Sequence, residues 1–347
     1  MHQGHLDILM NAKKENDVCF VGVCGYDREA RAEEIGLPLN KRVNLIKELF
    51  KDDEQVIVFS VDDGELGIAN SFLEENWDIW IKHIYNMVYT RYPGYKNLTW
   101  YVAEKEYESS LKRRGEQVKC YPKSNSVSGT LIREKPLTYW NKITSVFRPY
   151  LTKNILITGT ASEGKSTLVR DIGRYFNLPY CEEYGRTYMK NKCLFDTDLN
   201  FDIFKEFLIG QRADIVNKMH SPGNNGVVIS DTDNLVTLMY AKVYADDPNM
   251  KYFKQKDYEM LYNMAVMMDK DITWEKIFLL KPRNKFVNDG TRYMVQAVME
   301  ERIKNYNVLV QLLKEFNLWH RVEILDGDYL QNFNRVKDYI NDLYGIL

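Results

Sequence analysis

A glycine-rich loop with the pattern of a phosphate-binding P-loop lies near the middle of the chain, between an apolar run and a predicted helix. Backbone N–H groups can wrap phosphate oxygens only where side chains do not obstruct them, which accounts for the glycines. The N-terminus of the following helix adds a positive dipole end. In such a loop Lys165 reaches the β- and γ-phosphates, and the Ser166 hydroxyl holds Mg²⁺. The candidate ATP-binding residues of the loop are Gly159, Ser162, Gly164, Lys165, Ser166 and Thr167. The alternative is a chance glycine loop, but the strand–loop–helix context is the one that a P-loop requires.

Carboxylates that could complete a kinase site follow two predicted strands. Asp231 ends an apolar strand, where a group that organises Mg²⁺ is expected, and Asp233 lies two residues later on the same side of an extended chain. Glu182 and Glu183 follow a short strand candidate, and a carboxylate there could accept the proton of a substrate hydroxyl. The alternative for each acid is a solvated loop charge. We expect one of Asp231, Asp233 and Glu183 to act as general base and the others to hold Mg²⁺ or ribose hydroxyls.

A basic segment at residues 283–292 follows a later predicted strand. Its composition fits a mobile flap that closes Arg292 over a transferring phosphoryl group. It also fits an ordinary surface loop, so both interpretations stay open.

A second phosphate-handling signature is divided between the two ends of the N-terminal half. His2 and His5 form an H-x-G-H pattern, and Ser128, Thr130 and Arg133 form an S-x-T-x-x-R pattern that closes the same half. The pair is typical of nucleotidyltransferases, which orient an attacking phosphate against the α-phosphate of a nucleoside triphosphate. The imidazoles would face the phosphates, and Arg133 would grip the β- and γ-phosphates. Alternatively, Ser128 and Thr130 only cap a helix, and the histidines belong to a disordered terminus.

Trp77 has two interpretations. It belongs to a predicted helix over residues 76–92 whose apolar spacing favours packing in the core. An aromatic ring near a nucleotide site could instead stack on a flat, cationic heterocycle.

Predicted strands alternate with predicted helices in both halves, which indicates two α/β domains with parallel sheets. The predicted strands are residues 17–23, 55–60, 98–102, 117–121, 154–158, 226–231, 276–280 and 321–325. The predicted helices are residues 6–14, 40–51, 76–92, 165–176, 200–218, 255–268 and 294–316. We predict a Rossmann-like nucleotidyltransferase domain at 1–136, a linker at 137–153 and a P-loop kinase domain at 154–347.

The bulk composition excludes several classes of protein. The 347 residues carry a formal net charge of −2, so no basic surface for nucleic acid is expected. Five scattered cysteines without a C-x-x-C pair indicate reduced, intracellular thiols. Neither a membrane-spanning apolar stretch nor a signal peptide is evident. A cytoplasmic protein with small-molecule partners is therefore expected, and the sequence allows a homo-oligomer.

These motifs together resemble the bacterial NadR-type bifunctional proteins, in which nicotinamide mononucleotide adenylyltransferase is fused to ribosylnicotinamide kinase. The resemblance covers nearly the whole chain. The segments that carry it are HQGH at 2–5, GLPLNKR at 36–42, SGTLIREKP at 128–136, the P-loop at 159–167, EYGR at 183–186, DTD at 231–233 and VNDGTR at 287–292.

The resemblance implies two consecutive reactions on one nucleotide precursor. The C-terminal half would phosphorylate the 5′-hydroxyl of nicotinamide riboside with ATP and Mg²⁺, giving nicotinamide mononucleotide. The N-terminal half would join that product to the AMP of a second ATP, giving NAD and pyrophosphate. The resemblance also implies that Tyr184 and Arg186 bind substrate, and it favours Glu183 over Glu182 as the catalytic acid.

The chain differs from the family pattern at its start. Some members carry a helix-turn-helix domain before the adenylyltransferase, and the family has a strand and a loop just upstream of H-x-G-H, whereas this chain begins at Met1. We therefore expect no repressor function and a Rossmann-like sheet without its first strand. Two alternatives follow: a kinase with an inactive N-terminal half, and a nucleotide-sensing regulator that acts through a partner.

Overall fold

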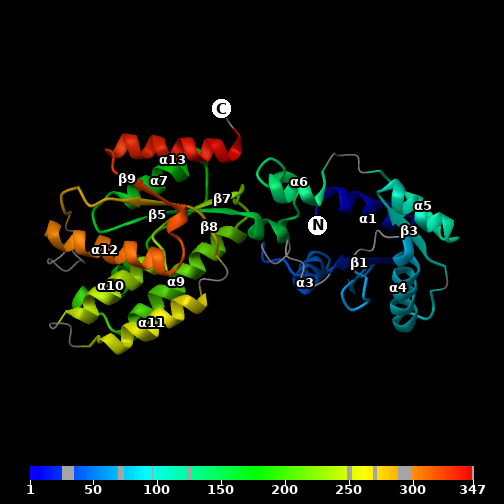
Figure 1. Ribbon diagram of the computed structural model, residues 1–347, viewed down its shortest axis with the longest axis horizontal. Coiled ribbons are helices and arrows are strands. Elements are labelled where there is room, and N and C mark those ends of the chain that lie inside the picture. Colours follow the sequence, from blue (N-terminus) through cyan, green and yellow to red (C-terminus); the bar gives the residue numbers. More distant parts are fainter. Residues whose placement is uncertain are drawn as a thin grey trace. The chain divides into compact units, whose positions relative to one another are not determined.

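The computed structural model describes residues 1–25, 35–68, 74–95, 97–122, 127–247, 252–268, 272–287 and 298–345. The chain divides into two compact units, Met1–Leu151 and Thr152–Leu347. In Figure 1 the first unit runs from blue to green and the second from green to red.

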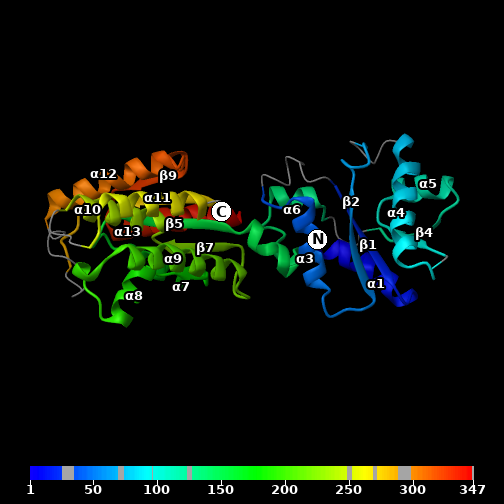
Figure 2. The same cartoon turned by 90° about the horizontal axis from the view of Figure 1, so that it is seen from below.

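The first unit is an α/β fold, as its alternating pattern predicted. Its elements are α1 (Gln3–Glu15), β1 (Cys19–Gly25), α3 (Leu39–Leu49), β2 (Val56–Asp62), α4 (Trp77–Arg91), β3 (Thr99–Val102), α5 (Lys105–Arg113), β4 (Gln117–Cys120) and α6 (Gly129–Glu134). β1 pairs in parallel with β2, and β3 pairs in parallel with β4 (Figure 2). Within the described residues no strand joins β1 to β3.

The segment predicted as a linker at 137–153 instead belongs largely to the first unit. It forms two 3₁₀ helices, Trp140–Lys142 and Ser145–Leu151, and the unit boundary follows the second. Three of its apolar side chains, Trp140, Ile143 and Phe147, are buried in the same cluster as residues of α1 and α3. Burial of these large apolar side chains, each worth roughly 1.5–3 kcal/mol, fixes the segment in the core instead of leaving it as a connection between units.

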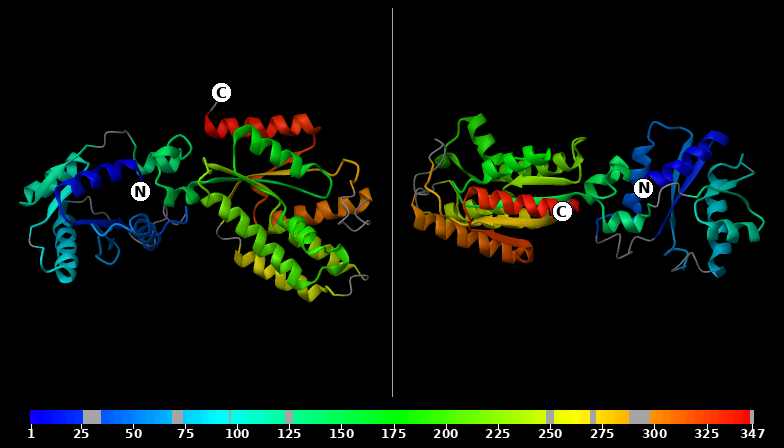
Figure 3. Two further views of the ribbon diagram at one scale, coloured as in Figure 1. Left: turned by 180° about the vertical axis from the view of Figure 1, so that it is seen from behind. Right: turned by 90° about the horizontal axis from the view of Figure 1, so that it is seen from above.

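The second unit is a parallel sheet covered by helices on both faces. Its elements are β5 (Lys153–Gly159), α7 (Lys165–Phe176), β6 (Tyr180–Cys181), α8 (Tyr184–Lys192), α9 (Phe201–His220), β7 (Val227–Asp231), α10 (Asn234–Asp246), α11 (Gln255–Met268), β8 (Trp274–Leu280), α12 (Met299–Glu315), β9 (Val322–Leu325) and α13 (Tyr329–Tyr344). The described strands lie in the order β6-β7-β5-β8-β9. α7 and α13 cover one face, and α9, α10, α11 and α12 lie on the other (Figures 1 and 3).

The centre of this sheet positions the functional loops. β5 lies between β7 and β8, and its Ile155, Leu156 and Ile157 are fully buried. Such continuous apolar runs are typical of parallel strands covered on both faces. The carboxyl ends of β5 and β7 therefore meet at one edge, where ligands of open α/β sheets bind. Among the described residues, no helix has the length and apolarity needed to cross a bilayer.

Candidate active sites

The loop after β5 has the backbone conformation of a phosphate cradle. Gly159 has φ of 144°, and a Cβ added there would lie 2.8 Å from the carbonyl oxygen of Leu280. Gly164 is the N-cap of α7, with φ of 84°. Because both positions lie in a region that L side chains rarely adopt, glycine is required at each. The start of α7 then presents its backbone N–H groups to the space enclosed by the loop.

The P-loop lysine and the carboxylate that ends β7 lie together at this edge. Lys165 is buried and its Nζ donates a hydrogen bond to the carbonyl oxygen of Thr160 at 2.7 Å. Asp231 is 1% exposed. Burial raises the pKa of Asp231, and the neighbouring Glu183 raises it further, while the charge of Lys165 opposes both effects. A buried carboxylate of this kind needs a cation to remain ionised.

Asp231 and Ser166 form an oxygen donor set suited to Mg²⁺. The Ser166 hydroxyl lies close enough to Asp231 to lower the pKa of the carboxyl. Yet no hydrogen bond of ordinary geometry from the described residues reaches either oxygen of Asp231. No group of three or more metal-binding side chains occurs in the part of the chain that the structure describes. This arrangement fits Mg²⁺ bound to a nucleotide, since that ion takes one or two protein oxygens and completes its shell with phosphate and water.

The two candidate catalytic acids point to different places. Glu183, the N-cap of α8, forms an ion pair with Arg186 at 2.7 Å between Oε2 and Nη2. Nη1 of Arg186 donates to Ser166 Oγ at 3.1 Å, which connects Glu183 to the P-loop. Glu182 is exposed and instead pairs with Arg170 on α7 at 2.7 Å. The geometry therefore favours Glu183 as the acid of the site.

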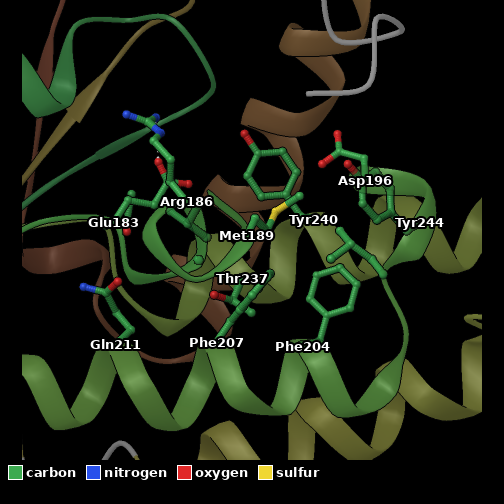
Figure 4. A pocket seen from close by; sticks show the side chains of 14 residues that line it. Glu183, Arg186, Met189, Asp196, Phe204, Phe207, Gln211, Thr237, Tyr240 and Tyr244 are labelled. Carbon is green, nitrogen blue, oxygen red and sulfur yellow. Dashed lines mark ion pairs between the residues drawn. The ribbon is translucent and has the colours of Figure 1, made fainter. Parts of the chain in front are cut away.

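Glu183 and Arg186 form one end of a pocket beside the P-loop (Figure 4). The other end is built by Asp196 and Tyr244, and Tyr240 lies between the two ends with further aromatic and apolar side chains. The lining residues are Glu183, Gly185, Arg186, Met189, Asp196, Leu199, Phe204, Phe207, Gln211, Thr232, Val236, Thr237, Tyr240 and Tyr244. A concave space lined by aromatic and apolar side chains together with polar and charged groups suits a small molecule.

Two predicted site residues have local structural roles here. Asp233 is the N-cap of α10, and its Oδ1 accepts a hydrogen bond from the backbone N–H of Leu235 at 3.1 Å. The Tyr184 ring lies directly against Gly210 of α9 and does not line the pocket. Of the predicted substrate-binding pair, the structure brings only Arg186 into the pocket.

The predicted flap lies partly outside the described residues, and Arg292 is among those that are not described. Its first part contacts the P-loop: the backbone N–H of Val287 donates to Ser162 Oγ at 3.1 Å. The backbone N–H groups of Arg283 and Asn284 donate to Glu163 Oε2 at 3.1 and 3.2 Å.

Two buried groups that hold the site together were missed in the sequence. Gln211 of α9 accepts a hydrogen bond from the backbone N–H of Tyr184 at 2.8 Å, and its Nε2 donates to the carbonyl oxygen of Glu182 at 3.4 Å. Arg302 of α12 donates to Glu163 of the P-loop at 2.8 Å. Nothing in the local sequence distinguishes either residue from a polar residue on a solvated helix face.

In the first unit, His2 and His5 lie at the start of α1. His2 is the N-cap and is buried, whereas His5 is exposed, and their ring centroids are 3.8 Å apart. The backbone of His2 forms a bridge with Ile143. The two imidazoles are therefore held side by side and ordered, which excludes the disordered-terminus alternative.

The second half of this motif lies on α6, next to the start of the chain in Figures 1 and 2. Ser128 is the N-cap of α6 and accepts a hydrogen bond from the backbone N–H of Leu131 at 3.2 Å. Thr130 Oγ1 accepts from Arg133 Nη2 at 3.2 Å. Ser128 thus caps the helix, as the capping alternative predicted, whereas Thr130 instead orients the guanidinium of Arg133 on its own helix.

A further basic residue near this motif is Arg42 of α3, in the segment 36–42. Its Nη1 donates to the carbonyl oxygen of Cys24, at the end of β1, at 3.4 Å. Burial, followed by the charge of Arg42, lowers the pKa of the Met1 amino group to about 5. Arg42 therefore adds positive potential beside the two histidines.

Trp77 packs in the core of the first unit. It is 4% exposed and contacts Trp80 and Tyr107 edge-on, with ring centroids 5.5 and 5.1 Å away. The structure therefore supports packing, one of the two interpretations that the sequence left open.

Comparisons with known proteins agree with this arrangement. A cytidylyltransferase-like family matches residues 1–135, and an AAA domain family matches residues 154–331. The chain is 24% identical to the trifunctional NAD biosynthesis/regulator protein NadR of Salmonella typhimurium strain LT2 over 359 aligned residues, covering 99% of this chain and 81% of that protein. The protein of the same description from Escherichia coli strain K12 is also 24% identical, with the same coverage of both chains.

Two solved structures are similar along the whole chain. A NadR protein in complex with NR has a TM-score of 0.83 and 30% identity, covering 100% of this chain and 93% of that one. A NadR protein in complex with NAD and AMP-PNP has a TM-score of 0.82 and 30% identity, covering 100% of this chain and 94% of that one.

Proposed function

The chain belongs to the NadR family, and on that basis we propose that its two units carry out consecutive steps of NAD synthesis. The second unit transfers the γ-phosphoryl group of ATP to the 5′-hydroxyl of nicotinamide riboside. The first unit transfers the adenylyl group of ATP to the resulting nicotinamide mononucleotide. The observation that carries the kinase assignment is the pocket that begins at Glu183 and Arg186, directly beside the P-loop.

The residues of the second unit supply binding, orientation and charge. Backbone N–H groups of the P-loop and of the start of α7 hold the phosphates. Lys165 neutralises charge that develops on the transferring group. Glu183 accepts the proton of the 5′-hydroxyl, and Arg186 holds that carboxylate in place through the 2.7 Å ion pair.

Mg²⁺ would be held by Asp231 and Ser166, where it would offset the charge of the triphosphate. This assignment rests on the buried carboxylate of Asp231 and the adjacent hydroxyl. Asp233 caps α10 and so stabilises the turn that follows β7, and we assign it no role in the chemistry.

In the first unit, His2, His5, Arg133 and Arg42 would stabilise the triphosphate of the second ATP. The two guanidinium groups supply positive charge and, together with the side-by-side imidazoles, hydrogen-bond donors, without a covalent step. A kinase with an inactive first unit, or a nucleotide sensor, are the competing functions, and turnover separates them.

Lys165→Ala is expected to lower the rate of nicotinamide riboside phosphorylation by at least about 10²-fold, because preorganised charge at a transferring group typically contributes that much. Product analysis with nicotinamide riboside, ATP and Mg²⁺ measures it. In the wild type, nicotinamide mononucleotide should appear first and NAD with pyrophosphate second.

Two controls make this test specific. The Lys165→Ala protein should still convert supplied nicotinamide mononucleotide to NAD, since the change lies in the other unit. Lys205→Ala removes a half-buried lysine that pairs with Asp202 on α9 and should leave both rates unchanged. Wild-type phosphorylation by the Lys165→Ala protein would refute the P-loop assignment. Binding of ATP without turnover by the wild type would favour the sensor.

A further inference from the structure

The two acids of the second unit follow neighbouring strands, but only one of them lies on its strand. β7 ends at Asp231, whereas β6 ends at Cys181, two residues before Glu183. The last register pair of these strands is Cys181 with Ser230. The charge of Glu183 raises the pKa of Asp231, so the two carboxylates are close enough to repel each other. The strand pairing alone therefore does not fix Glu183 relative to Asp231.

Gln211 of α9 holds the backbone on both sides of Glu183. Its Oε1 accepts the backbone N–H of Tyr184 at 2.8 Å, and its Nε2 donates to the carbonyl oxygen of Glu182 at 3.4 Å. Gln211 is 3% exposed and reaches from α9 toward Glu183 (Figure 4). Its amide thus takes the place of a strand partner beyond the end of β6.

Ser230 connects this amide to the turn after β7. Nε2 of Gln211 also donates to Ser230 Oγ at 3.4 Å, and Ser230 Oγ donates to the carbonyl oxygen of Thr232 at 2.7 Å. A hydroxyl has one proton to donate, so Ser230 gives it to Thr232 and accepts from Gln211. Ser230 is fully buried on β7 and does not line the pocket. Any effect of Ser230 on a bound molecule must therefore pass through its neighbours.

The turn that receives this hydrogen bond has a strained backbone. Thr232 has φ of 70°, which is an outlier for a β-branched residue. Such a conformation persists only where its surroundings impose it. The N–H of Thr232 donates to the carbonyl oxygen of Ile157 on β5 at 3.1 Å, and Ser230 holds its carbonyl group. These two bonds fix the turn that directly follows Asp231.

We propose that Ser230 and Gln211 are paired positioning residues that set the distance between Glu183 and Asp231. This inference rests on the proposed kinase function, in which Glu183 serves the riboside hydroxyl and Asp231 serves the nucleotide through Mg²⁺. Reacting atoms must approach to about 3–3.5 Å with the correct alignment before transfer. A change in the spacing of the two acids therefore lowers kcat while the binding contacts of both reactants remain.

The first test compares Ser230→Thr with Ser230→Val. Threonine and valine have nearly the same shape, so both variants share any overpacking in the core, but only threonine keeps the hydroxyl. A misplacement of about 1 Å can cost about 10²-fold in rate, so kcat of Ser230→Thr should exceed that of Ser230→Val by at least about tenfold. KM for the riboside should differ by less than about threefold, because no contact with substrate is removed.

The second test asks whether the two residues act as one unit. Gln211→Met keeps the side-chain length without the amide, and it should lower kcat by at least about tenfold. The double variant with Ser230→Val should lose no more than about threefold beyond the worse single variant, because coupled residues are not additive. Gln311→Met is the matched control: this glutamine is exposed on α12 and pairs with Glu315, so its loss should leave kcat unchanged.

Hydrogen exchange provides a measurement that needs no turnover. Gln211→Met removes the acceptor of the Tyr184 amide, so exchange in a peptide spanning residues 182–188 should become faster. Ser230→Val should accelerate it as well, because the amide of Gln211 loses one of its acceptors. Ser230→Thr and Gln311→Met should exchange at the wild-type rate.

The outcomes separate this inference from the function on which it rests. Equal kcat for Ser230→Thr and Ser230→Val would overturn the positioning role of Ser230 and leave the kinase assignment intact. Multiplied losses in the double variant would show that the two residues act independently and would overturn the pairing. If the wild type phosphorylates no riboside, the kinase assignment fails, and with it the positioning role; unchanged exchange at 182–188 would refute the hydrogen-bonded link by itself.

Discussion

Glu183→Gln is expected to lower kcat for nicotinamide riboside phosphorylation by about 10²–10⁴-fold, the usual contribution of a positioned general base. The glutamine side chain has almost the same shape but cannot accept the hydroxyl proton. KM should change much less, because the apolar walls of the pocket remain. Steady-state kinetics with saturating ATP and Mg²⁺ measure both constants.

Glu182→Gln provides a matched control one residue away. Its carboxylate is exposed and pairs with Arg170, and exposed ion pairs contribute about 0–1 kcal/mol. The rate should therefore stay near that of the wild type. If Glu182→Gln loses the larger share of kcat, the assignment of the two acids is reversed.

The elements around the P-loop could be predicted because their sequence signals are local. The predicted helix at 165–176 and the helix at 255–268 match α7 and α11 residue for residue. The predicted central strands 154–158 and 226–231 match β5 and β7 within a residue or so. Continuous apolar runs, glycines with left-handed backbone and a lysine at a helix start are each visible in a few adjacent residues.

The walls of the pocket could not be predicted because they depend on tertiary packing. α8 and α10 were not predicted, although Tyr240, Tyr244 and Arg186 lie on them. α10 is apolar on most of its surface and its capping residue, Asp233, was assigned to chemistry instead. An apolar helix buried on several sides has no clear period, so its pattern is ambiguous between helix and strand.

Among the candidate site residues, too, those in local motifs could be predicted and those that depend on tertiary contacts could not. The sequence supplied Lys165, Ser166 and Asp231 by motif, and the resemblance chose Glu183 over its neighbour. The sequence could not show that Gln211 and Arg302 hold the segments around these residues in place. The two partners of each hydrogen bond come from segments far apart in the chain. The sequence also could not decide between core packing and stacking for Trp77, because helical spacing is the same for both.

The ion pair between Arg302 and Glu163 ties α12 to the P-loop. Both side chains are buried, at 2% and 1% exposed, and their atoms lie 2.8 Å apart. Nη2 of Arg302 also donates to the carbonyl oxygen of Asn284 at 2.7 Å. Glu163 in turn accepts the backbone N–H groups of Arg283 and Asn284. One guanidinium thus connects three segments around the phosphate cradle.

Arg302→Met is therefore expected to lower the free energy of unfolding of the second unit by about 3–5 kcal/mol, the cost of leaving a buried charge without its partner. A urea titration that is monitored by hydrogen exchange in peptides from β5 and β7 reports on the unfolding of this unit alone. Arg302→Lys should recover only part of the loss, because a lysine keeps the charge but cannot donate to Glu163 and Asn284 together.

Lys304→Met is the control, two residues further along the same helix. Lys304 is 69% exposed in its side chain and pairs with Glu301, so its loss should cost less than about 1 kcal/mol. If Arg302→Met is no more destabilising than Lys304→Met, the buried pair does not stabilise the fold.

The loss of Arg302 should also affect ATP binding, because Glu163 is part of the P-loop and would lose its partner. KM for ATP should therefore rise more than KM for the riboside, since neither Arg302 nor Glu163 lines the pocket.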